Sequence, residues 1–234
     1  MRALSFSAQA AGEEEEQMTN GELIMTMLFS FLLAGLLFVV IPTGAAHLAE
    51  RFTQNPVVFN LIEGGIRLMV FLLYIWGISF MQGIHRVFQY HGAEHKTIHC
   101  YEAGKALTVE NVQKFPRLHP RCGTNFLLIV MIVAIVFHVF FGWPDLWVRI
   151  LSRLAVLPIV AGVSYEIIRF AGRSESALVR IAITPGLWLQ YLTTRPPDDE
   201  MVEVAIESLK AVLPPDEIPL GSGNYRKEAF CSIN

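Results

Sequence analysis

Charged residues are scarce in this sequence. Only 17% of its 234 residues are Asp, Glu, Lys or Arg, whereas a soluble domain carries about 25%. Its three cysteines are too few and too irregularly spaced for a disulfide framework. The formal net charge of −3 provides no basic excess of the kind that binds nucleic acid. These shortages exclude an ordinary cytosolic globule and a disulfide scaffold, and we expect no nucleic acid among the partners.

Long apolar stretches take the place of the missing charge. The clearest runs from Leu23 to Ile41, 19 residues without a charge, and a helix of that length can cross about 30 Å of hydrocarbon. Three further stretches are predicted to span a membrane: Leu68–Ile84, Phe126–Phe141 and about Leu146–Ile168. We therefore expect an all-α fold, an integral membrane bundle of about four transmembrane helices.

Local signals predict where these helices begin and end. Pro42 and Gly44 are expected to close the first span, and Asn55-Pro56 resembles an N-cap followed by proline at the first helical position. Glu63 and Arg67 precede the second apolar stretch, so we expect them at the membrane interface.

The chain divides into five predicted segments. They are a cytoplasmic N-terminal segment (1–22), two transmembrane helices with a short outer loop (23–84), a cytoplasmic His-rich helical loop (85–125), two transmembrane helices with an interfacial segment (126–195), and a cytoplasmic amphipathic helix with a tail (196–234). The interfacial segment, residues 178–192, is interrupted by Pro185-Gly186. The amphipathic helix, capped by Asp198 or Asp199 and ended by Pro214, is expected to pack on the protein itself.

Basic residues predict the orientation. With four spans, 14 Lys and Arg residues fall on the side that holds both termini and the loop 85–125, against 4 on the opposite side. We therefore expect a multi-pass protein whose two termini both face the cytoplasm.

The loop 85–125 carries the residues with chemical potential. At about 100° per residue of helix, His91, His95, His99 and Glu102 fall within an arc of about 80°. Glu94 borders this arc, whereas Cys100 points to the opposite face. The sequence contains no glycine-rich phosphate loop and no Gly-x-Ser-x-Gly nucleophile elbow, so this histidine face is the main candidate site.

Histidines at positions i and i+4 can bind one divalent ion, because their side chains meet over a single turn of helix. His91-Gly92-Ala93-Glu94-His95 also matches the H-x-x-E-H pattern of inverted zinc peptidases, in which the glutamate is the general base. This pattern predicts a catalytic role for Glu94 and a cofactor of Zn²⁺ or another divalent metal. The third ligand is left open among three residues: Glu102, His119 and Cys122.

The same residues are also compatible with a loop that binds no metal ion. The histidines and acids can hydrogen-bond one another and the helix ends, while basic side chains of the loop bind lipid phosphates. The candidates for that role are Arg86, Lys96, Arg117 and Arg121.

Four strings in this order, YHGAEHK, CYEAG, LTVENV and HPRCGTNFL, resemble the YqhQ-like family of bacterial polytopic membrane proteins, as does the later LQYLTTRPP. The family carries a domain of unknown function, and its members are labelled metal-dependent enzymes. The resemblance implies location in the bacterial inner (plasma) membrane, and it implies candidate ligands at His91, His95, His119 and Cys122. It supplies no substrate. Family members begin with a glycine-rich segment that has no counterpart in this sequence.

Three functions follow as hypotheses. The first is a metal-dependent hydrolase, zinc-dependent by its residues, at the cytoplasmic membrane surface. The second is a non-enzymatic homo-oligomer, such as a pore, a transporter component or a scaffold. The third is a protein that binds anionic lipids of the bilayer. The sequence leaves open whether the protein is an enzyme.

Overall fold

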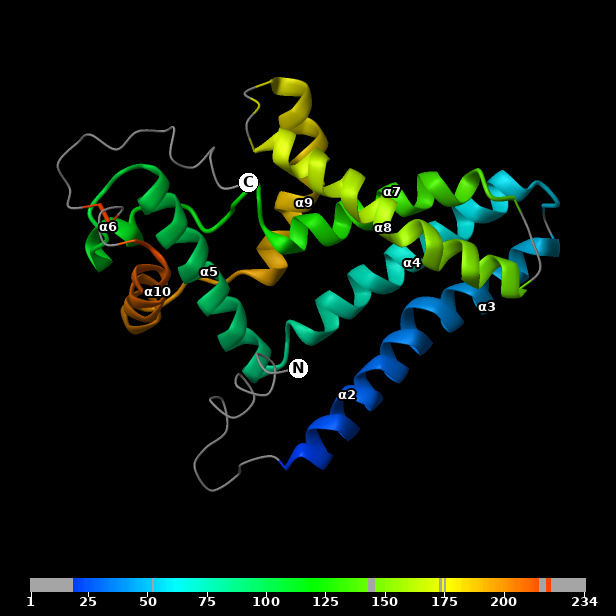
Figure 1. Cartoon of the computed structure of the whole chain (residues 1–234), viewed down its shortest axis with the longest axis horizontal. Helices are drawn as coiled ribbons and strands as arrows, with labels where there is room; N and C mark the ends of the chain where they lie inside the picture. Colours follow the sequence, from blue (N-terminus) through cyan, green and yellow to red (C-terminus); the bar gives the residue numbers. More distant parts are fainter. Residues whose placement is uncertain are drawn as a thin grey trace. The chain divides into compact units, whose positions relative to one another are not determined.

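The computed structural model describes residues 19–51, 53–142, 146–172, 174, 176–214 and 218–219, and every regular element among them is a helix (Figure 1). In chain order the elements are α2 (Asn20–Gly35), the π-helical turn η1 (Leu36–Val40), α3 (Ile41–His47), the 3₁₀ turn η2 (Leu48–Arg51), α4 (Pro56–Ile78), α5 (Gln82–Glu102), α6 (Val109–Gln113), α7 (Gly123–Val139), α8 (Leu146–Ala171), α9 (Ala177–Thr193) and α10 (Asp199–Val212). The all-α prediction is confirmed for these residues. Most of the predicted N-terminal segment 1–22 and of the predicted C-terminal tail lies outside them.

Three stretches of helix are long and apolar enough to cross a bilayer: Gly21–Ala46, Pro56–Ile78 and Leu151–Ala171. Helix α7 is also apolar, but its 17 residues are fewer than the roughly 20 of a typical span. The described residues therefore hold three candidate spans, and the predicted count of four stays a prediction. By its contacts the chain divides into two compact units, with the division inside α4 between Phe71 and Leu72.

The first candidate span continues past its predicted end. The turn η1 joins α2 to α3, and Pro42 lies within this continuous helix. A proline has no N–H to offer the carbonyl four residues earlier, which here belongs to Phe38. Arg67 of α4 donates to that carbonyl instead, with its Nε 2.9 Å from the Phe38 oxygen. The expected stop at Pro42 was wrong, because a distant side chain serves the backbone group that proline cannot.

Glu63 and Arg67 lie within α4 and not before it, and their expected place at the membrane interface stays a prediction. The Glu63 side chain is 1% exposed, and its Oε1 lies 2.9 Å from Arg67 Nη2. The same oxygen accepts a hydrogen bond from Thr43 Oγ1 at 3.0 Å. A buried carboxylate needs partners of this kind, because an unpaired charge in an apolar environment is costly.

Helix α4 begins where the sequence predicted but ends earlier. The Asn55 side chain caps the helix as expected, with its Oδ1 2.9 Å from the backbone N of Val57. The helix ends at Ile78, before the predicted Ile84, and residues 79–81 separate it from α5. The second apolar stretch therefore crosses a break that no proline marks in the sequence.

Helices α5, α6 and α10 pack together around a small apolar core (Figure 1). Its fully buried members include Val112 of α6 and Val202 of α10. Asp198 caps α10 through a 2.8 Å hydrogen bond from the backbone N of Met201. The prediction that this amphipathic helix packs on the protein itself is confirmed.

Helix α9 packs against α7 and is continuous through Pro185, although the sequence predicted an interruption there. Gly186 permits the contact: a Cβ at this position would lie 1.6 Å from Oδ1 of Asn125. Asn125 is 1% exposed, and its Nδ2 donates to the Pro120 carbonyl at 2.7 Å. The contact thereby links α9 to the segment that leads from α6 into α7.

Candidate metal centre

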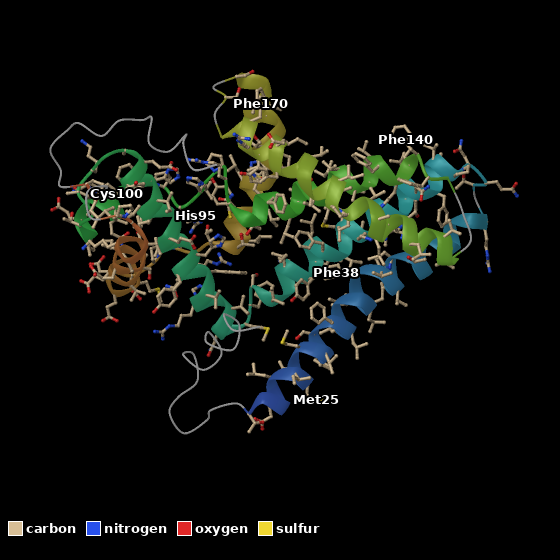
Figure 2. The ribbon with its side chains drawn as sticks, viewed as in Figure 1. Met25, Phe38, His95, Cys100, Phe140 and Phe170 are labelled. Carbon is tan, nitrogen blue, oxygen red and sulfur yellow. The ribbon has the colours of Figure 1, made fainter. Side chains whose placement is uncertain are left out.

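Helix α5 carries His91, His95 and His99 at four-residue intervals along one face. The rings of His91 and His95 lie edge to face with centroids 4.3 Å apart. The opposite face, which includes Ala93 and Cys100, is buried in the core with α6 and α10. Figure 2 shows His95 on the side of α5 toward α7 and α9, and Cys100 nearer α6. The histidine face is therefore directed toward the segment that joins α6 to α7.

His91, His95 and Cys122 form a first group, here called the thiolate cluster. One ligand atom of each lies within 4.8 Å of the other two. Cys122 is the N-cap of α7, where its Sγ accepts a 3.3 Å hydrogen bond from the backbone N of Thr124. The same sulfur lies 3.2 Å from Nε2 of His91. The structure thus brings three of the five predicted ligands together.

Backbone carbonyls fix the orientation of both imidazoles in the thiolate cluster. Nδ1 of His91 lies 2.8 Å from the Thr193 carbonyl oxygen, and Nδ1 of His95 lies 2.6 Å from that of Arg117. A carbonyl can only accept a hydrogen bond, so each Nδ1 carries the proton. A neutral ring then has its lone pair on Nε2 and can bind a metal ion there, whereas a ring that donates a hydrogen bond to the Cys122 thiolate carries a second proton on Nε2. Metal-binding histidines in proteins are commonly held in this way.

The electrostatics of the cluster favour an ionised thiol. Burial raises the pKa of Cys122, but hydrogen bonds with His91 and His95 and the N–H of Thr124 outweigh it and bring the pKa to about 5. Burial lowers the pKa of His91, whereas its hydrogen bonds with Cys122 and Thr193 raise the pKa above its usual value. Cys100, in the apolar core, differs: burial raises its pKa. Cys122 is therefore a thiolate at neutral pH, and Cys100 is a thiol.

His99, Glu102 and His119 form a second group, here called the carboxylate cluster, whose ligand atoms also lie within 4.8 Å of one another. The rings of His99 and His119 have centroids 4.6 Å apart, and His119 Nε2 lies 3.4 Å from Glu102 Oε2. Glu102 Oε1 pairs with Arg121. Burial raises the pKa of Glu102, but the hydrogen bond with His119 and the charge of Arg121 bring it below its usual value.

Gln190 of α9 holds the backbone of His119 from both sides. Its Oε1 accepts from the backbone N of His119 at 2.8 Å, and its Nε2 donates to the His119 carbonyl at 2.8 Å. The Gln190 side chain is fully buried. This fixed segment places His119 and Cys122 opposite the histidine face of α5.

The remaining predicted site residues are members of neither cluster. Glu94 is exposed and belongs to neither group, although its charge contributes to the raised pKa of His91.

The four predicted phosphate-binding residues have separate partners within the protein. Lys96 Nζ donates to the Gln113 carbonyl at 2.7 Å, and Arg121 pairs with Glu102. The guanidinium carbon of Arg86 lies 6.0 Å from the ring centroid of Tyr90, and that of Arg117 lies 5.7 Å from the ring centroid of Tyr191.

Sequence reasoning missed the residues that orient the ligands. The Thr193, Arg117 and Leu118 carbonyls contact the histidines, and a backbone oxygen has no signature in the sequence. Gln190 gave one signal, a polar residue within the apolar helix α9.

Comparison with known proteins gives a family but no activity. A family model described as "Protein of unknown function (DUF1385)" matches residues 1–215. The chain is 38% identical over 225 residues to "Uncharacterized protein YqhQ" of Bacillus subtilis (strain 168), which covers 90% of this chain and 71% of that protein. No solved structure matches the chain.

Proposed function

This chain belongs to the DUF1385 family, and we propose that it is a membrane protein whose thiolate cluster binds a transition-metal ion. Zn²⁺ is the best match, and the proposed activity is hydrolysis at the membrane surface. One observation carries the proposal: ligand atoms of His91, His95 and Cys122 lie within 4.8 Å of one another. Electron-rich atoms at this distance repel one another unless a proton or a metal ion lies between them, and a metal ion can contact all three at once.

The set of ligand atoms favours zinc. Two imidazoles and one thiolate match the Cys/His sites of zinc enzymes, and three protein ligands leave a fourth position for water or substrate. Hard cations such as Mg²⁺ and Ca²⁺ prefer oxygen ligands, so they match this cluster poorly. Bound zinc supplies Lewis acidity and a water of lowered pKa.

The side chains around the cluster have distinct parts in this proposal. His91 and His95 are oriented by backbone carbonyls and hold the ion with Cys122. Glu94, which is exposed, is the general base that the H-x-x-E-H pattern predicts. Glu102 is less available as a base, because His119 and Arg121 already hold its carboxylate.

A second candidate function uses the thiolate itself as the nucleophile. The 3.2 Å contact between Cys122 and His91 supports it, as does the pKa of about 5 for the cysteine. A thiol–imidazole pair requires only one histidine, however, and gives no role to His95, whereas a metal site uses all three residues. Activity that survives removal of metal and is lost on alkylation of Cys122 identifies this second function.

The proposed topology has four spans, with α7 as the short one, and places both termini and the loop 85–125 in the cytoplasm of a bacterial cell, at the inner membrane. The distribution of Lys and Arg supports this orientation. Labelling of single introduced cysteines in cells by a membrane-impermeant reagent tests it. An introduced cysteine at exposed Lys105 is expected to stay unlabelled until the membrane is opened, and labelling in intact cells contradicts the orientation.

The bilayer is the proposed partner, with anionic lipids near the basic residues of the loop. A homo-oligomer of this chain also remains a proposal. Its mass in mild detergent is the measurement that tests it, and a strictly monomeric particle contradicts it.

The metal content of the full chain, purified from cells without chelator, tests the central proposal. We expect at least one equivalent of zinc or a similar ion per chain, and loss of the thiolate-cluster ion in the double variant His91→Ala/His95→Ala. His85→Ala is the matched control, because His85 is exposed on the same helix and belongs to neither cluster. Wild-type protein without metal, or unchanged metal in the double variant, overturns the proposal.

A further inference from the structure

We propose that the carboxylate cluster, His99, Glu102 and His119, is a second divalent-cation site, so that the protein holds two metal ions side by side. The inference extends the proposed metal centre but uses a separate set of ligands. Its failure can therefore be told apart from the failure of the thiolate cluster.

The carboxylate cluster offers a recognised set of ligand atoms. Two imidazoles and one carboxylate lie within 4.8 Å of one another. Zinc hydrolases and non-haem iron(II) enzymes both use this combination. Since the cluster has no sulfur ligand, it suits harder first-row ions such as Mn²⁺, Fe²⁺ and Co²⁺ as well as Zn²⁺. The two neighbouring sites are therefore expected to differ in their preference for metal.

Two of its ligands are already oriented by outer partners. His99 Nε2 donates to the Leu118 carbonyl at 2.8 Å, which leaves the lone pair of the neutral ring on Nδ1. Arg121 holds Oε1 of Glu102, so that Oε2 is directed to His119. Outer contacts of this kind fix ligand orientation before the ion arrives, as they do in metalloproteins generally.

The contact between His119 and Glu102 marks the position of the cation. Without an ion, Nε2 of His119 donates a weak hydrogen bond to Glu102 Oε2 at 3.4 Å, and its Nδ1 accepts one from the backbone N of Arg121 at 3.2 Å. A cation replaces the proton between ring and carboxylate, and the ring proton moves to Nδ1 at the expense of the contact with Arg121. Gln190 holds the His119 backbone in place during this exchange.

The two clusters are adjacent. His95 and His99 lie one helical turn apart on α5, and His119 and Cys122 lie on the same turn before α7. The rings of His95 and His119, one from each cluster, have centroids 5.8 Å apart. Neighbouring cation sites are typical of enzymes that hydrolyse phosphoesters and peptides, and this narrows the proposed substrate class.

Cobalt reconstitution of the full chain in detergent tests the second site. The protein is stripped with a chelator and dialysed against Co²⁺, and two quantities are measured: bound cobalt per chain, and the thiolate-to-cobalt charge-transfer absorption that only the Cys122 site produces. We expect two ions in the wild type. We expect one ion in Glu102→Gln, with the charge-transfer absorption unchanged. Glu203→Gln is the control, since Glu203 is exposed on α10, and it should keep both ions.

Each outcome decides the proposal. A wild-type protein with one ion and a full charge-transfer absorption overturns the second site and leaves the thiolate cluster standing. No bound cobalt overturns both sites. Two ions retained in Glu102→Gln also overturn the second site. If Glu102→Gln does not fold, His99→Ala replaces it: we expect one bound ion with the charge-transfer absorption unchanged, and two retained ions overturn the second site.

Discussion

The carbonyl oxygen of Arg195 lies directly against Gly92 of α5. A Cβ at position 92 would be 2.2 Å from that oxygen, closer than any side chain can approach. The contact is reinforced by a 2.8 Å hydrogen bond from the backbone N of Arg195 to the Phe88 carbonyl. Two residues earlier, Thr193 at the end of α9 supplies the carbonyl that orients His91. Because Gly92 has no side chain, the backbone at Arg195 can pack directly on α5 beside the metal centre.

Replacement of Gly92 by alanine is expected to displace the backbone at Arg195. Because the obstacle is backbone, the clash should cost about 1–3 kcal/mol of unfolding free energy, as overpacking does elsewhere. Loss of the Thr193 contact should also weaken metal binding. Thermal unfolding followed by circular dichroism and metal analysis measure both effects. Gly83→Ala is the matched control, since no atom lies within 4 Å of a Cβ there. Equal stability and metal content in the two variants would contradict the account.

Gln190→Leu tests the support beneath His119. The variant leaves the backbone N–H of His119 buried without its partner, which costs about 1–3 kcal/mol. The His119 carbonyl loses the Gln190 amide and keeps only the 3.3 Å hydrogen bond from the backbone N of Cys122. We expect a clear loss of stability and looser metal binding. Gln82→Leu, at an exposed position of α5, should change neither. Wild-type stability in Gln190→Leu would show that the two hydrogen bonds are unimportant.

The ionisation of Cys122 predicts a pH dependence in the metal-free protein. Its pKa of about 5 lies below the 9.0 of an ordinary thiol. A lowered pKa contributes stability that is complete above pH 9, declines as pH falls and is lost below about pH 5. The ultraviolet absorption of the thiolate should show a step near pH 5 that Cys122→Ser lacks. A step near pH 9 instead would contradict the proposed hydrogen bonds from His91 and His95.

The buried pair in α4 predicts an unequal effect of single and double substitution. Arg67→Met leaves the Glu63 carboxylate buried without its cation, and breaking such a pair costs about 3–5 kcal/mol. Glu63→Gln/Arg67→Met removes both charges and should cost less than the single change. Chemical unfolding in detergent compares the two variants. A double variant less stable than Arg67→Met would show that the buried charge of Glu63 is not the main cost of the single substitution.

The amino-acid pattern predicted the histidine face and the type of fold well, because both follow from local periodicity. The i, i+4 spacing placed His91 beside His95, and the opposite position of Cys100 put it into the core. The cap at Asn55 and the docking of α10 followed from equally local signals.

Long-range contacts explain most of the differences. Pro42 does not end the first helix, because Arg67 of another helix serves the Phe38 carbonyl. The five predicted metal ligands separate into two clusters, since His119 lies beside Glu102 while Cys122 lies beside His91. Periodicity along one helix cannot reveal which turn of α5 a returning loop meets.

X-ray absorption spectroscopy at the edge of the metal bound to the natively purified protein shows whether Cys122, His91 and His95 hold an ion. We expect a sulfur neighbour at about 2.3 Å and imidazole nitrogens at about 2.0–2.1 Å from the ion. We also expect Cys122→Ser to remove the sulfur. A protein that contains no metal, or a metal whose neighbours include no sulfur from Cys122, would contradict the proposed site.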